Sequence, residues 1–142
     1  MELAARLLGG DPSGRAVTVL GGAFKAGSDD VRDSPALDVA ARLHGLGARV
    51  RVHDPRAGQN IRRTRPRLTV VDDLTHACQD SELVLVLTEW PEFAAIDPVA
   101  LGQVVAGRTV IDGRLVLDPV KWADAGWELH ALGRGRVRAG GR

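Results

Sequence analysis

Two cationic side chains in one long polar segment are the first candidates for chemistry in this sequence. The segment is Gly22–Asp33 (GAFKAGSDDVRD), which carries Lys25 and Arg32 together with aspartates that can orient them or cap a following helix. It follows an apolar run typical of a β-strand. Ligands of doubly wound sheets bind beyond the carboxyl ends of the strands, and loops this long are often functional. We interpret the segment as a ligand-binding loop, with a solvated loop whose Asp29 and Asp30 form turns as the alternative.

The glycines at the start of this segment do not form a dinucleotide-binding fingerprint. Gly21 and Gly22 permit a ligand to approach the backbone closely. The GxGxxG fingerprint, however, requires a helix to open within the glycine pattern, and here the next helix is expected only at Pro35. We therefore expect that this strand does not hold the pyrophosphate of NAD in the usual way.

The other reactive side chains indicate neither a nucleophile nor a metal site. Cys78 falls in a predicted short helix over residues 74–79, where His76, two positions away, does not share its face, so we interpret Cys78 as a structural thiol. The four histidines show no zinc-like spacing. Five arginines between Arg56 and Arg67 can bind phosphate, but we interpret this run as an exposed, solvated loop.

Short apolar runs alternate with helical segments along the chain, and these elements must position the candidate residues. The predicted strands are Ala16–Gly21, Ala48–Asp54, Leu68–Val71, Leu83–Leu87, Arg108–Asp112 and Trp127–Ala131. The predicted helices are Pro35–Leu46, with Ser34 as N-cap, Asp97–Ala106 and Asp118–Ala125. This alternation predicts a three-layer, Rossmann-like α/β domain with a mostly parallel sheet of five or six strands. The second strand alternates arginine with valine, which favours a place near an edge of the sheet.

The composition is that of one soluble globular domain. The chain has 142 residues, of which 44% are hydrophobic and 26% charged. Its net charge of +1 gives no electrostatic argument for nucleic-acid binding. The single cysteine excludes an intrachain disulfide and favours a cytoplasmic location. No apolar stretch approaches the roughly 20 residues of a membrane-spanning helix, so neither a membrane segment nor a membrane partner is expected.

Three ordered segments resemble the carboxyl-terminal, UDP-binding domain of the UDP-glucose/GDP-mannose dehydrogenase family, most of all its UDP-glucose 6-dehydrogenases. The first, VTVLGGAFKAGSDDVRDSPAL followed by a helix and RVHDP, is similar to the family pattern LGLAFKxxTDDxRxSPAL with its Tyr-Asp-Pro-like turn. The others are LVLVLTEWPEF and TVIDGRLVLDP, which resemble TEWxEF and DxRNxxD. The chain departs from these patterns at Gly22 (usually Leu), Ser28 (usually Thr) and Leu115 (usually Asn).

The resemblance implies a reaction and the residues that serve it. In this family a nucleotide-sugar 6-hydroxyl is oxidised to a carboxylate in two NAD-dependent steps. The NAD fingerprint and the catalytic cysteine belong to preceding domains that this sequence does not match. By motif position, Phe24 and Lys25 are implied to contact the nucleotide-sugar, Arg114 the UDP portion, and Arg32 the NAD held by another domain. The chain then carries no catalytic residue, and alone it is expected to be inactive.

The resemblance also implies how the chain is divided and what it meets. Residues 1–14 are expected to be the tail of a preceding helix with a linker, and 15–134 the nucleotide-sugar-binding domain. The glycine- and arginine-rich composition of residues 135–142 itself predicts a flexible tail. The expected partners are a substrate such as UDP-glucose, the other domains of the enzyme, and a second copy in a homodimer of the full enzyme. Whether the bound base is uridine or guanosine stays open.

Alternatives remain open for the whole chain and for single residues. The chain can instead be a free-standing, non-catalytic nucleotide-sugar-binding module or a structural remnant of such an enzyme. Arg114 can form an ion pair with Asp112 rather than bind a ligand. Trp90 and Phe93 are interpreted as packing a loop or a domain contact rather than stacking on a base.

Overall fold

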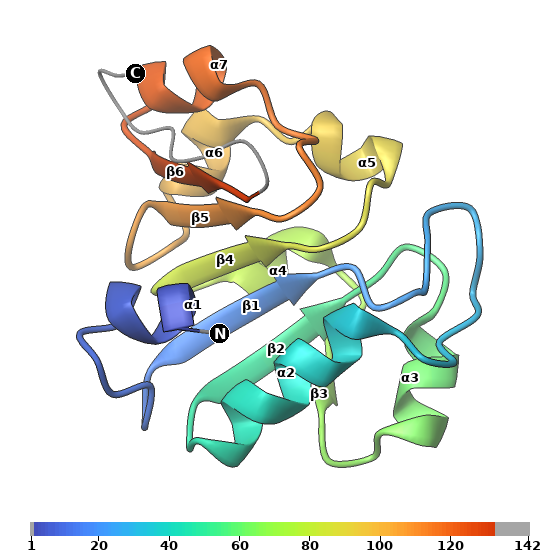
Figure 1. Cartoon of the computed structure of the whole chain (residues 1–142). Helices are drawn as coiled ribbons and strands as arrows, with labels where there is room; N and C mark the ends of the chain where they lie inside the picture. The colour runs from blue at the N-terminus through green and yellow to red at the C-terminus, as the bar shows by residue number, and fades with distance from the viewer. Residues whose placement is uncertain (1, 133–142) are drawn as a thin grey trace.

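Six parallel β-strands form one sheet at the centre of the structure (Figure 1). The computed structural model describes residues 2–132, so the tail expected at 135–142 lies outside the described residues. The strands are β1 (Ala16–Leu20), β2 (Arg49–His53), β3 (Thr69–Val70), β4 (Leu83–Val86), β5 (Thr109–Asp112) and β6 (Glu128–Ala131). Each of them falls within a predicted apolar run, because these runs alone supply enough Val, Leu and Ile to fill a sheet buried on both faces.

The order of the strands in the sheet is β3-β2-β1-β4-β5-β6. The chain builds one half outward from β1 to β3, then returns to place β4 on the other side of β1 and builds outward again. This is the strand order of the Rossmann fold, whose switch point lies between β1 and β4. The predicted three-layer α/β fold is confirmed.

Helices cover both faces of the sheet and bury two hydrophobic cores. The helices are α1 (Glu2–Leu7), α2 (Pro35–Gly45), α3 (Gly58–Thr64), α4 (Leu74–Cys78), α5 (Pro91–Ala94), α6 (Pro98–Gly102) and α7 (Pro119–Asp124). Leu8 directly after α1, Leu37 in the first turn of α2 and Ile61 in the middle of α3 belong to the core on one face. Helices α4 to α7 contribute to the core on the other face, where Trp122 and Trp127 pack edge to face with ring centroids 4.8 Å apart.

The helices begin where the capping residues predict. Ser34 accepts a hydrogen bond from the backbone N–H of Leu37 at the start of α2, and a proline occupies the first turn. Asp97 and Asp118 cap α6 and α7 in the same way. These two helices are shorter than predicted. No helix in residues 2–132 is both long enough and apolar enough to cross a membrane.

The expectation of an exposed loop over residues 56–67 is wrong, because Gly58–Thr64 form helix α3. Ile61 of this helix is fully buried in the core, and Arg65, just after it, donates a hydrogen bond of 2.9 Å to the Asp38 carboxylate of α2. A single apolar residue among polar ones has no helical period, so the sequence pattern could not reveal this helix. Tertiary contacts stabilise it instead.

Strand β2 lies next to the edge strand β3, as its alternating pattern predicted. Val50 and Val52 enter the core, whereas Arg51 on the opposite face donates hydrogen bonds to the backbone oxygens of His76 and Gln79 at the end of α4. Its guanidinium therefore adds side-chain donors to the carbonyl groups at the end of this helix.

Candidate functional site

The basic residues predicted as ligand contacts all follow the carboxyl ends of strands. These strand ends lie together along one side of the sheet, the carboxyl edge. Lys25 and Arg32 lie in the loop after β1, and Arg114 follows β5, with only β4 between these two strands. Two strand spacings separate the ends of β1 and β5 by about 10 Å. In Figure 1 the loop after β1 and the segment from β4 to α5 leave the sheet on this same side. This edge includes the switch point between β1 and β4, the usual ligand crevice of such a fold.

A buried carboxylate, Asp54, sets the start of the loop after β1. Asp54 follows β2 and is only 7% exposed. Its Oδ2 accepts the backbone N–H groups of Gly22 at 2.8 Å and Ala23 at 3.0 Å, and the indole N–H of Trp90 at 3.2 Å. Its Oδ1 accepts the backbone N–H groups of the two residues that follow Pro55, at 2.9 and 2.8 Å. Five donors thus compensate one buried negative charge, as burial of a carboxylate requires.

The end of β1 approaches the end of β4 so closely that only glycine fits there. Gly21 has a φ of +101°, and a Cβ atom at this position would overlap Oγ1 of Thr88, which follows β4. The Thr88 hydroxyl is buried and has no hydrogen-bond partner among the described residues. From the sequence we interpreted the glycines as a place where a ligand can approach the backbone closely. At Gly21 it is instead Thr88, after the neighbouring strand β4, that approaches the backbone.

Gly22 stands where the family pattern has leucine, and a side chain of helix α3 fills the space next to it. Gly22 is buried, and a Cβ atom there would lie 2.5 Å from Cδ1 of Ile61 and 3.1 Å from Cδ2 of Leu37. The Ile61 side chain therefore fills the space in which a side chain at position 22 would begin. The backbone of the loop can keep its place although its residue is smaller.

The loop after β1 exposes Phe24 and Lys25 to solvent. Phe24 is 50% exposed, and its backbone N–H donates to the backbone oxygen of Asp30 at 2.7 Å, which closes the loop over residues 24–30. The backbone oxygen of Asp29 accepts a hydrogen bond of 2.8 Å from Asn60 of α3. Among residues 2–132 no carboxylate lies within ion-pair distance of Lys25. The ammonium is therefore available to a ligand.

Arg32 forms a bidentate ion pair within its own loop. Its Nε and Nη2 donate to the two carboxylate oxygens of Asp30 at 3.0 and 2.9 Å, and its backbone N–H donates to the same carboxylate at 2.9 Å. These hydrogen bonds lower the pKa of Asp30 to about 2. The Arg32 side chain remains 86% exposed in this pair.

The alternative that Arg114 pairs with Asp112 is wrong. The Asp112 carboxylate accepts the backbone N–H groups of Arg114 at 3.1 Å and Leu117 at 2.8 Å, whereas the Arg114 guanidinium donates to Glu89, which follows β4, at 3.2 Å. Leu115, where the family pattern has asparagine, has a φ of +59°. Asparagine tolerates this left-handed conformation far better than leucine, so the backbone geometry favours the residue of the family pattern at this position.

The two aromatic residues after β4 pack the loop, as interpreted from the sequence. Trp90 is 5% exposed with its indole N–H on Asp54, and Phe93 is fully buried, with its ring edge to face against His53 at a centroid distance of 6.4 Å. Cys78 is buried too, and burial raises the pKa of its thiol to about 12. This value suits a structural thiol and opposes a role as a nucleophile.

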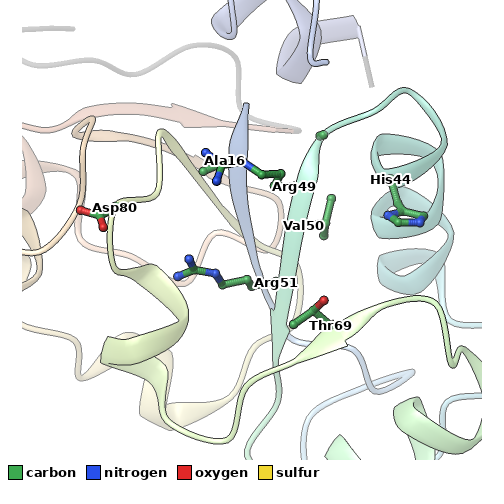
Figure 2. Close-up of a pocket in the computed structure, with 8 residues that line it drawn as sticks. Ala16, His44, Arg49, Val50, Arg51, Thr69 and Asp80 are labelled. Carbon is green, nitrogen blue, oxygen red and sulfur yellow. The ribbon is translucent and has the colours of Figure 1, made fainter. Parts of the chain in front are cut away.

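A cavity of about 510 Å³ lies at the opposite, amino edge of the sheet (Figure 2). Arg49 and Arg51 of β2 point to one side of the strand, and His44 of α2 lies on the other side (Figure 2). The guanidinium groups already donate to backbone oxygens, that of Arg49 to Gly14 at 3.3 Å and that of Arg51 to Gln79 at 2.9 Å. With both arginines engaged in holding turns, this cavity is not the candidate site.

Two acidic residues at the carboxyl edge were not singled out from the sequence. Asp54 holds the backbone of the loop that carries Lys25, and Glu89 holds the Arg114 guanidinium. A carboxylate directly after a buried apolar strand is the available signal for Asp54, since such a group must find donors in the adjoining turns. For Glu89 the sequence carries no comparable signal, because an exposed acid pairs with whichever cation the fold brings near.

Comparison with known proteins agrees with this geometry. Residues 18–119 match the UDP binding domain of the UDP-glucose/GDP-mannose dehydrogenase family. UDP-glucose 6-dehydrogenase TuaD of Bacillus subtilis is 35% identical over 130 residues, which cover 91% of this chain and 28% of that protein. A UDP-glucose dehydrogenase structure from Pyrobaculum islandicum is 39% identical with a TM-score of 0.71, covering 81% of this chain and 25% of that one. An NDP-N-acetyl-D-galactosaminuronic acid dehydrogenase from Methanosarcina mazei has a TM-score of 0.80 at 27% identity, covering 94% and 27%.

This chain spans less than a third of each of these relatives, and the matched region is the same UDP-binding part of the family throughout. The motifs, the strand order and the extent of the match agree, and the chain belongs to the UDP-glucose/GDP-mannose dehydrogenase family, in which it corresponds to the UDP binding domain.

Proposed function

We propose that the chain binds the UDP portion of a nucleotide-sugar at the carboxyl edge of its sheet, as part of an NAD-dependent nucleotide-sugar 6-dehydrogenase. The observation that carries the proposal is the available ammonium of Lys25, which shares an edge and a switch point with Arg114 two strands away. A diphosphate carries negative charge that suits two cations in loops whose parent strands end about 10 Å apart. The half-exposed ring of Phe24 offers an apolar surface beside the ammonium.

The Arg114 guanidinium can bind a ligand while it keeps its hydrogen bond to Glu89. Glu89 accepts only one hydrogen bond from Nη2, so the remaining N–H groups of the guanidinium stay available for phosphate oxygens. The Asp112 carboxylate meanwhile holds the Arg114 backbone N–H. Glu89 then orients the Arg114 guanidinium, but its negative charge also weakens the attraction between this guanidinium and an anionic ligand.

We infer that residues 2–132 do not form a complete site for NAD. In dinucleotide-binding Rossmann domains, an acid after the second strand binds the ribose hydroxyl. Here that acid is Asp54, whose two oxygens already accept five N–H groups. The Asp54 carboxylate is therefore not available to the hydroxyl groups of the adenosine ribose. We infer that NAD is held by another domain of the whole enzyme and that Arg32, exposed at the outer end of the loop, extends toward it.

The activity of the whole enzyme needs groups beyond this chain. Oxidation of the sugar 6-hydroxyl to a carboxylate requires a hydride acceptor and a nucleophile, and Cys78 is too deeply buried and too weakly acidic to serve as one. We expect that the chain alone, a soluble cytoplasmic module, binds nucleotide-sugar but does not oxidise it. A homodimer is a proposal for the full enzyme only.

Calorimetric titration of the chain with UDP, UDP-glucose, GDP-mannose and NAD tests the proposal. We expect UDP and UDP-glucose to bind and NAD to bind far more weakly. Lys25→Ala and Arg114→Ala should each weaken UDP binding by about 1.5–3 kcal/mol, the scale for hydrogen bonds to charged groups. Lys121→Ala removes an exposed lysine of helix α7 that belongs neither to the loop after β1 nor to the turn that carries Arg114, and it should leave the affinity unchanged. Equal effects of the Lys25 and Lys121 variants would contradict the assignment.

A further inference from the structure

Asp54 contacts the backbone that leads directly to Lys25. The two N–H groups that it accepts, from Gly22 and Ala23, belong to the residues three and two positions before Lys25. The same carboxylate closes its own turn after β2, so the loop after β1 is tied to the end of the neighbouring strand. The direction in which the chain leaves β1 toward the ammonium therefore depends on this one buried group.

Trp90 connects the Asp54 carboxylate to the residue that pairs with Arg114. The indole N–H of Trp90 donates to Asp54 Oδ2, which places the ring in the buried layer between the ends of β2 and β4. The preceding residue, Glu89, accepts a hydrogen bond from the Arg114 guanidinium. Because Glu89 is bonded directly to Trp90, the anchored indole restrains the stretch of backbone from which the partner of Arg114 projects.

We propose that Asp54 is a positioning residue for nucleotide-sugar binding: it holds the Lys25 loop directly and the Glu89–Arg114 pair through Trp90, so that both cations are oriented together. This inference rests on the proposed function. An ionised aspartate suits the role because donors converge on both of its oxygens, three on Oδ2 and two on Oδ1. An asparagine has one acceptor oxygen and would turn an N–H₂ group toward the remaining donors.

A matched pair of tryptophan variants separates positioning from general stability. Trp90→Phe removes the hydrogen bond to Asp54 and keeps a buried ring. Trp127→Phe is the control, because Trp127 is also buried and its indole N–H also donates one hydrogen bond, to the backbone oxygen of Pro98 at 2.8 Å, in the core on the α6 and α7 face. Both variants lose a buried indole hydrogen bond, and only one of them loses the link to Asp54.

The first readout is the affinity of the chain for UDP, measured by calorimetry. We expect Trp90→Phe to weaken UDP binding about tenfold, the lower scale for a hydrogen bond to a charged group, and Trp127→Phe to change it less than about twofold. In a Lys25→Ala/Arg114→Ala background the effect of Trp90→Phe should largely disappear, because the two cations through which it acts are gone. Equal effects of the two tryptophan variants, or full additivity in that background, would overturn the inference.

The second readout needs no ligand and keeps the inference separate from the proposed function. Amide hydrogen exchange should show the Gly22 and Ala23 N–H groups protected in the wild type and exchanging faster in Asp54→Asn. In Trp90→Phe the guanidinium protons of Arg114, which donate to Glu89, should also exchange faster in NMR spectra, and in Trp127→Phe all of these exchange rates should be unchanged. If wild-type chain fails to bind UDP while these exchange rates respond as stated, the proposed function is wrong and the structural link stands. If the Trp90→Phe rates match the wild type, the link itself is refuted.

Discussion

Gly21 connects β1 to the loop that carries Lys25, and its replacement by alanine measures how closely β1 and β4 approach at the switch point. Its φ of +101° is a conformation that residues with a Cβ atom rarely adopt. An added Cβ would also overlap Thr88 Oγ1 and lie 2.9 Å from both Cβ and Cγ2 of Thr88. Because these atoms are buried, the clash cannot be relieved by turning a side chain into solvent.

The expected loss of stability has two parts. A positive φ costs an alanine about 1–2 kcal/mol, and overpacking of a buried contact costs a further 1–3 kcal/mol or so. Gly21→Ala should therefore lower the free energy of unfolding by about 2–5 kcal/mol. Gly27 separates the two parts, because it lies in the same loop with a φ of +84° and has open space where an added methyl group would lie. Gly27→Ala should cost only the conformational part.

Urea denaturation followed by circular dichroism gives both values, provided that the dependence of the free energy on urea concentration is the same in all variants. Thr88→Ala combined with Gly21→Ala should recover part of the loss, since it removes two of the three clashing atoms. If Gly21→Ala and Gly27→Ala destabilise the chain equally, the strands do not pack as closely as described. A double variant no more stable than Gly21→Ala would refute the assignment of the clash to Thr88.

Three further predictions follow from single side chains. Leu115→Asn should raise the free energy of unfolding by about 1 kcal/mol, because it relieves a left-handed leucine at an exposed site, and an unchanged urea midpoint would contradict this. Arg32→Ala should return the pKa of Asp30, measured by NMR titration, from about 2 toward 3.8; in the wild type the stabilisation from this pair is present above about pH 4 and is lost as the pH falls toward 2. Burial raises the pKa of the Cys78 thiol from 9.0 to about 12, so the stability that depends on the neutral thiol is complete below pH 9 and is lost between pH 9 and about 12. Cys78→Ala should lack this part of the alkaline decline, and identical pH profiles would refute it.

The sheet could be predicted from the sequence because each strand carries its own signal. Runs of valine, leucine and isoleucine between glycine, proline and aspartate define the strands, and capping residues such as Ser34 define where the helices begin. Helix α3 has no such local signal, because Ile61 alone reaches the core. Its stability comes from contacts with α2 and the loop after β1, which only the folded chain brings together.

The position of the basic residues could be predicted, but their ionic partners could not. Parallel strands bring their carboxyl ends to one edge, so Lys25 and Arg114 were expected there once the strands were known. Pairing of Arg114 with Asp112 was the nearest possibility along the chain, and the fold instead supplies Glu89, 25 positions away. Exposed ion pairs contribute little free energy, so no strong sequence pattern accompanies the choice.

The aspartates that end β2 and β5 indicate how the loops of the candidate site are held. Asp54 and Asp112 each follow or close a buried strand, and each accepts backbone N–H groups from the turn that comes next. A carboxylate in this place cannot reach bulk solvent, so the adjoining turn must present its donors or the strand end is destabilised. The hydrogen bonds to the buried acids thus determine the backbone conformation of these loops. The loops in turn determine where their cationic side chains point. A Rossmann-type sheet can in this way use the acid after its second strand to hold a loop, where dinucleotide-binding relatives of the fold use it to hold a ribose.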